Sequence, residues 1–176
     1  TLYRNGPGLF ERDGYKKKHL LDGDGMIQAV DFSGGDVRYR NHFVQTPKFI
    51  AEEEAGKFLM PTWTTLAPDF WNSIPGTPSE SQAGVTTYMV NGRLTAHAEA
   101  GQPFELDPVT LEDLGEMPVM GEEGPGSYKD HTKVDGRTGD WIFVGWNHGP
   151  TPGMEVVIKN RDGGLALHRK VEADRD

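Results

Sequence analysis

Glycine and proline interrupt this sequence so often that no helical pattern of about 12 residues survives between them. The chain has 23 glycines and 12 prolines in 176 residues. Short runs rich in Val, Ile, Tyr, Phe and Thr recur between these breaks, and such runs bounded by turn residues are typical of β-strands. The sequence therefore predicts an all-β fold that is built from hairpins.

Turn residues place five hairpins along the chain. The most specific signal is Asn91-Gly92, because both residues of this pair accept the positive φ that a two-residue hairpin turn requires. The predicted hairpins run from 26–32 through SGGD to 37–45, from 86–90 through NG to 93–99, from 104–107 through PVT to 111–114, from 133 through RTGD to 144, and from 154 through RDGG to 171.

The spacing of these turns favours a β-propeller. The turns near 92 and 138 lie 46 residues apart, and those near 109 and 162 lie 53 apart. Two hairpins, or four strands, per ~45–50 residues are typical of a propeller blade, and about two to three blades fit within this chain. A β-sandwich is the alternative, but its hairpins are less regular in sequence. Residues 49–83 interrupt this regular spacing of hairpins, and we expect a long irregular segment with a short helix there.

Charge and composition exclude several classes of function. Lys and Arg number 18 against 27 Asp and Glu, which gives a formal charge of −9 that repels nucleic-acid phosphates. The absence of cysteine leaves histidine and carboxylates as the strong metal ligands. No apolar run approaches the ~18 residues of a membrane-spanning helix. We therefore expect a cytoplasmic protein that does not bind nucleic acid, with peripheral contact to a membrane left open.

The stretch DGDG at residues 22–25 raises the question of a calcium site, because hard cations prefer clustered carboxylates. The spacing of an EF-hand loop is not met, since no glutamate stands at the required distance from Asp22. The alternative is a tight turn whose aspartates bond to backbone amides, and we favour it.

Two further places carry residue types suited to a metal site. Alternation along 93–99 puts His97 and Glu99 on the polar face of a strand, where such side chains are usually solvated. His131 lies just before a predicted strand and its RTGD turn. One histidine is a weak signal for a metal site, so the residues alone leave two readings of His131 open: a metal ligand, or a polar residue at the end of a strand.

Five longer stretches carry a resemblance to a known family. They are LYRNGPGLFE (2–11), HLLDGDGMIQAVDF (19–32), VRYRNHFVQT (37–46), VNGRLTAHAEAGQPFELDPVTLEDLG (90–115) and DHTKVDGRTGDWIFVGW (130–146). Together, and in this order, they resemble the N-terminal part of the carotenoid cleavage oxygenase family, which includes the lignostilbene dioxygenases and retinal pigment epithelial membrane protein. Its members are non-haem iron enzymes that cut double bonds in carotenoids, apocarotenoids and stilbenes.

The resemblance implies a seven-bladed β-propeller with Fe(2+) on its axis, held by four histidines. His131 matches the first ligand motif of the family, with Thr132 in place of the usual proline. Glu99 matches a glutamate that accepts a hydrogen bond from a ligand imidazole, here from a histidine expected beyond this chain. Neutral imidazoles leave iron(II) its charge and open positions for dioxygen, and such carboxylates fix the orientation of the rings.

The reaction that the resemblance implies is iron(II)-dependent cleavage of a carbon–carbon double bond in an apolar polyene by dioxygen, giving two carbonyl products. Ala98 stands where the stilbene-cleaving branch has a lysine, which favours a carotenoid or apocarotenoid substrate. Residues 58–71 lie where family members often carry apolar surface that draws substrate from a membrane. Burial of these aromatic residues as local core is the alternative, and we favour it.

The resemblance also implies that the chain supplies one of the four histidine ligands. We therefore expect residues 1–176 to be the N-terminal part of a single propeller domain that is inactive alone, with the remaining blades on the rest of the protein or on a second chain. A metal-free propeller module that binds a small ligand or a protein is the alternative function. A propeller hydrolase with calcium at DGDG is a third, which the spacing of that motif disfavours.

Overall fold

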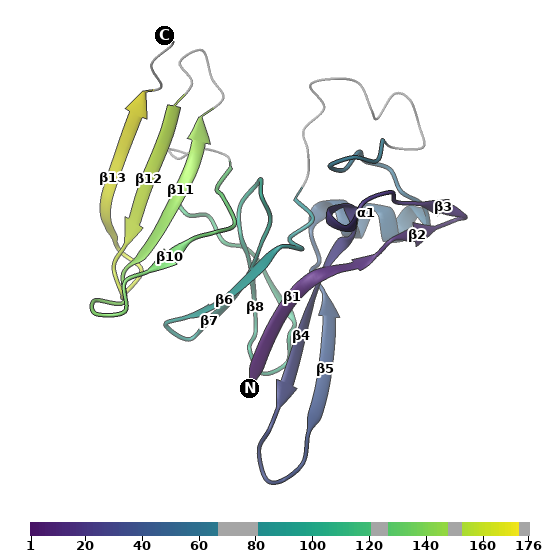
Figure 1. The fold of residues 1–176 in the computed structure, drawn as a ribbon, viewed down its shortest axis with the longest axis horizontal. Coiled ribbons are helices and arrows are strands. Elements are labelled where there is room, and N and C mark those ends of the chain that lie inside the picture. The colour runs from purple at the N-terminus through teal and green to yellow at the C-terminus, as the bar shows by residue number, and fades with distance from the viewer. Residues whose placement is uncertain (67–80, 121–126, 148–152, 173–176) are drawn as a thin grey trace.

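The computed structural model describes residues 1–66, 81–120, 127–147 and 153–172, and its regular structure is almost entirely β, as predicted (Figure 1). The strands are β1 (Leu2–Leu9), β2 (Glu11–Arg12), β3 (Tyr15–Lys16), β4 (Asp24–Asp31), β5 (Arg38–Phe43), β6 (Thr86–Val90), β7 (Arg93–His97), β8 (Phe104–Leu106), β9 (Asp113–Glu116), β10 (Lys133–Val134), β11 (Trp141–Asn147), β12 (Gly153–Lys159) and β13 (Leu165–Glu172). A 3₁₀ turn, η1 (Leu20–Asp22), and a helix, α1 (Pro47–Ala55), complete the described elements.

The first sheet has the order β1-β4-β5, and all its neighbours are antiparallel. The predicted hairpin from 26 to 45 forms β4 and β5. The short helix expected within 49–83 is α1, which begins two residues before that range, at Pro47. It begins after Thr46, whose hydroxyl accepts a hydrogen bond from the amide of Phe49, and it ends at Gly56 with a φ of 64°. Both are ordinary helix caps, and they explain why this helix is short.

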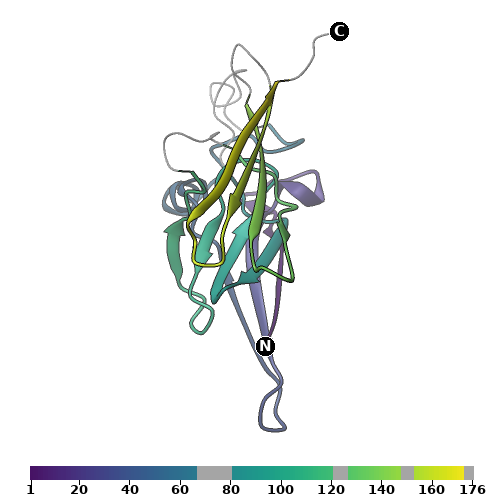
Figure 2. The same cartoon turned by 90° about the vertical axis from the view of Figure 1, so that its left-hand side faces the viewer.

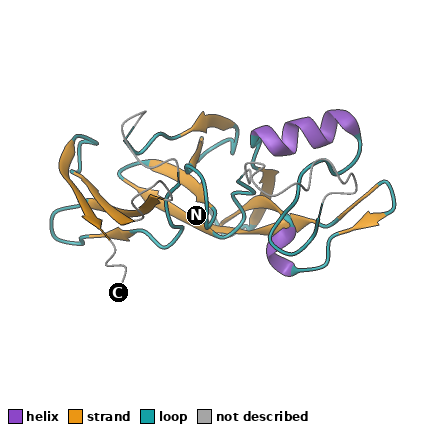
Figure 3. Cartoon of the chain, turned by 90° about the horizontal axis from the view of Figure 1, so that it is seen from above, coloured by secondary structure: helices purple, strands orange, loops and turns teal. Residues whose placement is uncertain are grey.

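The other predicted hairpins form two four-stranded antiparallel sheets, with the orders β6-β7-β8-β9 and β10-β11-β12-β13. Each sheet follows the chain without crossovers, as in a propeller blade. Asn91 and Gly92 have φ values of 51° and 84°, so the turn between β6 and β7 has the predicted conformation. Figures 1 and 3 show the three larger sheets side by side along the molecule, and Figure 2 views them along that row, one behind another.

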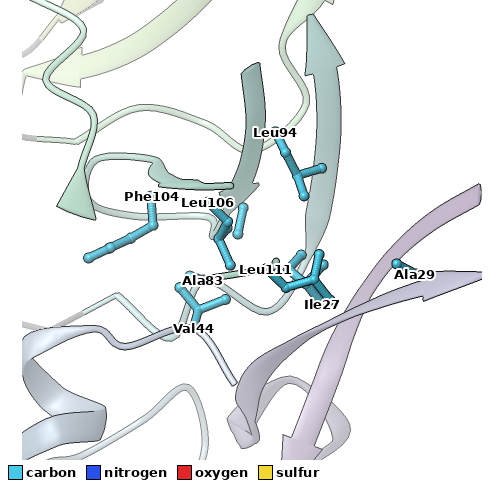
Figure 4. Close-up of a cluster of buried hydrophobic side chains, with 9 residues drawn as sticks. Ile27, Ala29, Val44, Ala83, Leu94, Phe104, Leu106 and Leu111 are labelled. Carbon is cyan, nitrogen blue, oxygen red and sulfur yellow. The ribbon is translucent and has the colours of Figure 1, made fainter. Parts of the chain in front are cut away.

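The sheets pack through two apolar clusters, one on each side of the sheet β6–β9. The first cluster joins it to β4 and comprises Ile27, Ala29, Val44, Ala83, Leu94, Ala96, Phe104, Leu106 and Leu111 (Figure 4). The second joins it to β11 and β12 and comprises Val90, Met117, Val119, Tyr128, Trp141, Phe143 and Val157. The middle sheet is therefore covered on both faces. On β13, in contrast, Leu165, Leu167 and Val171 are 55%, 37% and 45% exposed.

The first aspartate of DGDG holds two segments of the chain together. Asp22 accepts hydrogen bonds from the amides of His19 and Thr64 and from the hydroxyls of Thr64 and Thr65. Burial opposes its ionisation, but the hydrogen bonds from Thr65 and Thr64 hold the pKa of Asp22 far below its ordinary value. Asp22 thus bonds to backbone amides, as the turn interpretation predicts.

The second aspartate does not follow that prediction, because Asp24 belongs to a buried ion network. Its two oxygens lie 2.7 Å from Lys48 Nζ and 3.2 Å from Lys17 Nζ, and Lys48 Nζ also lies 2.6 Å from Glu52 Oε2. These four side chains are at most 2% exposed. The ring of Phe58 covers Lys17, with its centroid 4.3 Å from Nζ. The network fastens α1 to β4.

Replacement of Lys48 by Met tests this network. The substitution leaves Asp24 and Glu52 buried with too little positive charge, so we expect the free energy of unfolding to fall by about 3–5 kcal/mol. Urea denaturation of the protein that carries this chain measures the change. Lys57→Met, at an exposed position just after α1, should stay within about 0.5 kcal/mol. Equal midpoints for the two variants would contradict the assignment.

Candidate metal centre

The candidate site lies where the middle sheet meets the sheet β10–β13. Residues 127–131, which precede β10, run between the loop after β7 and strand β11. The amide of Tyr128 donates to the carbonyl of Gly101 at 3.0 Å, and the amide of Lys129 donates to the carbonyl of Val144 at 2.8 Å. These backbone bonds bring a residue just after β7 next to the start of β10.

Glu99, Asp130 and His131 form the resulting cluster. Their potential ligand atoms all lie within 4.8 Å of one another. His131 Nε2 lies 3.5 Å from Asp130 Oδ2, and the imidazole is 69% exposed while the Asp130 side chain is fully buried. Glu99 is between these extremes, and its Oε2 lies 3.1 Å from Lys129 Nζ. The two site residues predicted from the sequence, Glu99 and His131, are therefore neighbours in space.

Asp130 is electrostatically unusual. Its backbone carbonyl accepts a hydrogen bond from the Thr86 hydroxyl at 2.7 Å, and its buried carboxylate lies against that of Glu99. Burial, and then a side-chain hydrogen bond shared with Glu99, raise the pKa of Asp130. Burial also opposes ionisation of Glu99, but the ammonium of Lys129 holds the pKa of Glu99 below its ordinary value. The two carboxyl groups can therefore share one proton, with Asp130 neutral and Glu99 ionised.

The donor set suits a divalent transition metal. One imidazole nitrogen and two carboxylates are ligands that iron(II), zinc and related ions accept. His131 presents an imidazole that is 69% exposed, so it fits one position of the four-histidine iron site that the resemblance implies.

Thr132 replaces the family's usual proline, and the structure gives its hydroxyl a partner. Trp141 Nε1 donates to Thr132 Oγ1 at 2.9 Å, and Thr132 is 3% exposed. On the other side, Lys133 Nζ donates to the carbonyl of His131 at 2.7 Å. The backbone around His131 is therefore fixed by side-chain hydrogen bonds where proline would fix it by its ring.

Sequence reasoning missed Asp130 and Lys129 as members of this cluster. The signal was present, because both stand directly before His131. Asp130 stands at a bend before β10, however, where strand alternation does not say which way a side chain points. The short contact between Asp130 and His131 becomes visible only in three dimensions.

The expectation that His97 is solvated is wrong. His97 is 2% exposed, its ring lies edge-on to Tyr88 at 5.2 Å between centroids, and its Nε2 lies 2.9 Å from Thr95 Oγ1. Strand β7 is covered on both faces, so its polar face is buried as well. Burial lowers the pKa of His97 to about 4. His97 takes no part in the cluster of Glu99 with His131.

The aromatic segment from 58 to 71 was expected to be either local core or an apolar surface toward a membrane, and its described part contains residues of both kinds. Phe58 is 3% exposed and belongs to the interior, whereas Trp63 and Leu66 are 54% and 66% exposed. Residues 67–71 lie outside the described residues. Across the described parts of the chain, no helix has both the length and the apolar character needed to cross a membrane.

The two consecutive four-stranded sheets define the fold as part of a β-propeller. A candidate metal centre, with one histidine and two carboxylates, lies where these sheets meet. Comparison with known proteins agrees. Residues 1–175 match the family of the Retinal pigment epithelial membrane protein. The chain therefore belongs to this oxygenase family, and the resemblance predicted from its motifs is confirmed.

Individual relatives support the same conclusion. Isoeugenol monooxygenase of Pseudomonas nitroreducens is 33% identical over 93% of this chain and 34% of its own length. Apocarotenoid-15,15'-oxygenase of Synechocystis is 35% identical over 69% of this chain and 26% of its own. A glutamate-to-glutamine variant of Synechocystis apocarotenoid oxygenase has a TM-score of 0.86 at 25% identity, over 97% of this chain and 38% of that one.

These relatives confirm the predicted fold class, a part of a seven-bladed β-propeller. The chain spans 26% to 38% of the length of these three relatives.

The burial of His97 predicts how stability depends on pH. Its pKa is lowered from 6.5 to about 4, so between these values the unfolded chain takes up a proton that the folded chain does not. The contribution to stability is complete above pH 6.5 and is lost as the pH falls towards 4, by about 3 kcal/mol in all. His97→Gln does not titrate, so its unfolding free energy should change less with pH over this range. An equal pH dependence of the unfolding free energy in His97→Gln and wild type would contradict the burial of a neutral His97.

Proposed function

We propose that residues 1–176 form the N-terminal blades of a single-domain, iron(II)-dependent oxygenase. This enzyme uses dioxygen to cleave a carbon–carbon double bond in a carotenoid or apocarotenoid and releases two carbonyl products. The observation that carries the proposal is the meeting of Glu99 and His131 within one cluster of potential ligand atoms. Because this chain belongs to an oxygenase family, we infer that both residues belong to its iron site. His131 would bind the metal, and Glu99 would accept a hydrogen bond from a ligand imidazole.

In this proposal His131 is one of four imidazole ligands, and the others come from sequence beyond the described residues. Bound iron(II) supplies the open coordination positions at which dioxygen is activated. Lys129 holds the Glu99 carboxylate at 3.1 Å and keeps it ionised. An ionised carboxylate accepts a hydrogen bond from a ligand imidazole, which fixes the tautomer and direction of that ring. The hydrogen bonds at Thr132 and Lys133 keep the backbone of His131 in place.

Ala98 favours the apolar substrate class. It directly precedes Glu99 and offers neither a charge nor a hydrogen-bond donor to a phenol, as the lysine of the stilbene-cleaving branch would. One observation favours a second substrate class, a phenol with a conjugated side-chain double bond. This observation is the likeness to isoeugenol monooxygenase over 93% of the chain. Parallel turnover assays with an apocarotenoid and with isoeugenol decide between the two.

The location and the partners of the protein belong to the same proposal. We infer a cytoplasmic enzyme whose remaining blades are supplied by the rest of the protein or by a second chain. The exposed side chains of Trp63 and Leu66 offer an apolar surface for contact with a membrane that holds the substrate. A metal-free binding module remains the rival function, and stoichiometric iron in the purified protein excludes it.

Replacement of the proposed ligand gives a direct test. In the protein that carries this chain, His131→Ala should lower the iron content at least about tenfold, because one imidazole is lost from the metal. Cleavage of an apocarotenoid should fall in parallel. Iron analysis and product chromatography measure both effects. His168→Gln is the matched control, since His168 pairs with Glu155 at 2.7 Å on β13 and should retain iron and activity. Wild-type iron content in His131→Ala would refute the assignment.

The 176-residue chain produced alone should not cleave a polyene. Among its described residues the cluster offers one imidazole, and one imidazole with two carboxylates differs from the proposed four-histidine set. The assay is dioxygen-dependent loss of an apocarotenoid with added iron(II), run beside the full-length protein. Turnover by the chain alone at a rate close to that of the full-length protein would contradict the proposed division of ligands.

A further inference from the structure

A pocket lies at the end of the middle sheet that is opposite the cluster of Glu99 and His131. Strand β7 begins at this pocket with Arg93 and ends two residues before Glu99. The volume of the pocket is about 130 Å³. Asn91 Nδ2 donates to the carbonyl of Arg161 at 3.0 Å, so the turn after β6 is joined to the turn after β12 at the pocket. The pocket is therefore separate from the candidate metal centre.

The floor of the pocket is apolar. Val90, Met117 and Trp141 line it, and their exposed fractions are 7%, 3% and 4%. All three belong to the apolar cluster that joins the middle sheet to β11 and β12. A cavity of about 150 Å³ can hold benzene, so the volume here suits an apolar body of about the size of one ring. Such a body would gain free energy by leaving water for this floor.

The rim of the pocket is cationic, although the chain as a whole carries a formal charge of −9. Arg93, which lines it, donates from Nε to Glu105 Oε1 at 2.8 Å. Lys159 and Arg161 also line it, and neither forms an ion pair with a carboxylate in the described ranges. The carboxylate of Asp162 lines the pocket as well and forms no ion pair there either. Three cations and two carboxylates leave a net charge of +1.

Lys159 is the group at this rim that most needs an anion. It is half-buried, and burial, followed by the positive charge of Arg93, lowers the pKa of its ammonium. A bound anion would relieve both the burial of this charge and the repulsion. The stem of Arg161 lies against Gly139, where an added Cβ would be 3.3 Å from Arg161 Cγ and Cδ. A guanidinium held in this way can pair with both oxygens of a carboxylate.

We propose that this pocket binds a small aromatic monocarboxylate. In this proposal Lys159 and Arg161 hold the carboxylate, whose single negative charge balances the net charge of the rim. The ring lies on the apolar floor. Phosphate fits less well, because it carries more than one negative charge at neutral pH and has no apolar part to bury. Since the pocket and the candidate metal centre lie at opposite ends of β7, this inference does not depend on the proposed function.

Calorimetric titration of the full-length protein with benzoate tests the proposal. Benzoate should bind at least about tenfold tighter than benzamide, which has the same ring but no charge. The affinity for benzoate should fall as sodium chloride is raised, since salt screens charges at a surface. No binding of benzoate, an equal affinity for benzamide, or tighter binding of inorganic phosphate than of benzoate would overturn the proposal.

Replacement of Lys159 by Met tests the position of the site. Lys159→Met removes a charge that lacks an ion pair in the described part of the chain, so the variant should fold and should bind benzoate at least about tenfold more weakly. Arg161→Met, at an exposed turn, should show a similar loss. Lys57→Met removes a positive charge just after α1 and should bind as wild type. Wild-type affinity in Lys159→Met would overturn the proposal, and if that variant did not fold, wild-type affinity in Arg161→Met would do so.

A carboxylate can also bind iron, so His131→Ala serves as the control for the metal centre. This variant removes the proposed ligand and leaves the pocket intact, so it should keep the wild-type affinity for benzoate. Loss of benzoate binding in His131→Ala, with retained binding in Lys159→Met, would assign benzoate to the metal centre and contradict the inference. Unchanged benzoate binding with unchanged iron content in His131→Ala would refute the proposed function and leave this inference standing.

Discussion

The packing of the sheet β6–β9 between two other sheets is the constraint on which the rest of this structure depends. Its central strand β7 has apolar neighbours on both faces, with Leu94 and Ala96 in the cluster shared with β4 and His97 against Trp141 of β11. Because adjacent sheets are held face to face, the end of β7 and the start of β10 come to the same place. The meeting of Glu99 with His131 thus follows from sheet packing and needs no local motif of its own.

Local chemistry explains which parts of the fold could be predicted. The turn at Asn91-Gly92 was predictable because positive φ restricts the residue type, and the 46-residue spacing of turns revealed the blades. Two-residue alternation failed at His97, because it assumes that one face of a strand is solvated and β7 has no such face. Asp130 was missed for another reason, because it stands at a bend before β10 and not on a strand. Two-residue alternation predicts side-chain burial well in a sheet with one solvated face and poorly in a sheet that is covered on both faces.

The predicted turn interpretation of the DGDG stretch is correct for Asp22 and wrong for Asp24. Asp22 completes a turn with amides and hydroxyls, while Asp24 joins Lys17, Lys48 and Glu52 in an interior ion network. Lys48 and Glu52 face each other across one helical turn, which the sequence shows, but their contact with Asp24 depends on where α1 lies against β4. Because removal of one partner would leave a buried charge uncompensated, the network ties α1 to one place against β4.

The exposed leucines and valine of β13 mark a surface that closure of a propeller would bury. Leu165, Leu167 and Val171 present apolar side chains on a sheet whose neighbours along the chain already bury theirs. In a propeller each blade packs against the next, so a following blade would cover this face as β11 and β12 cover one face of the sheet β6–β9. Closure of the ring would therefore also remove these side chains from water.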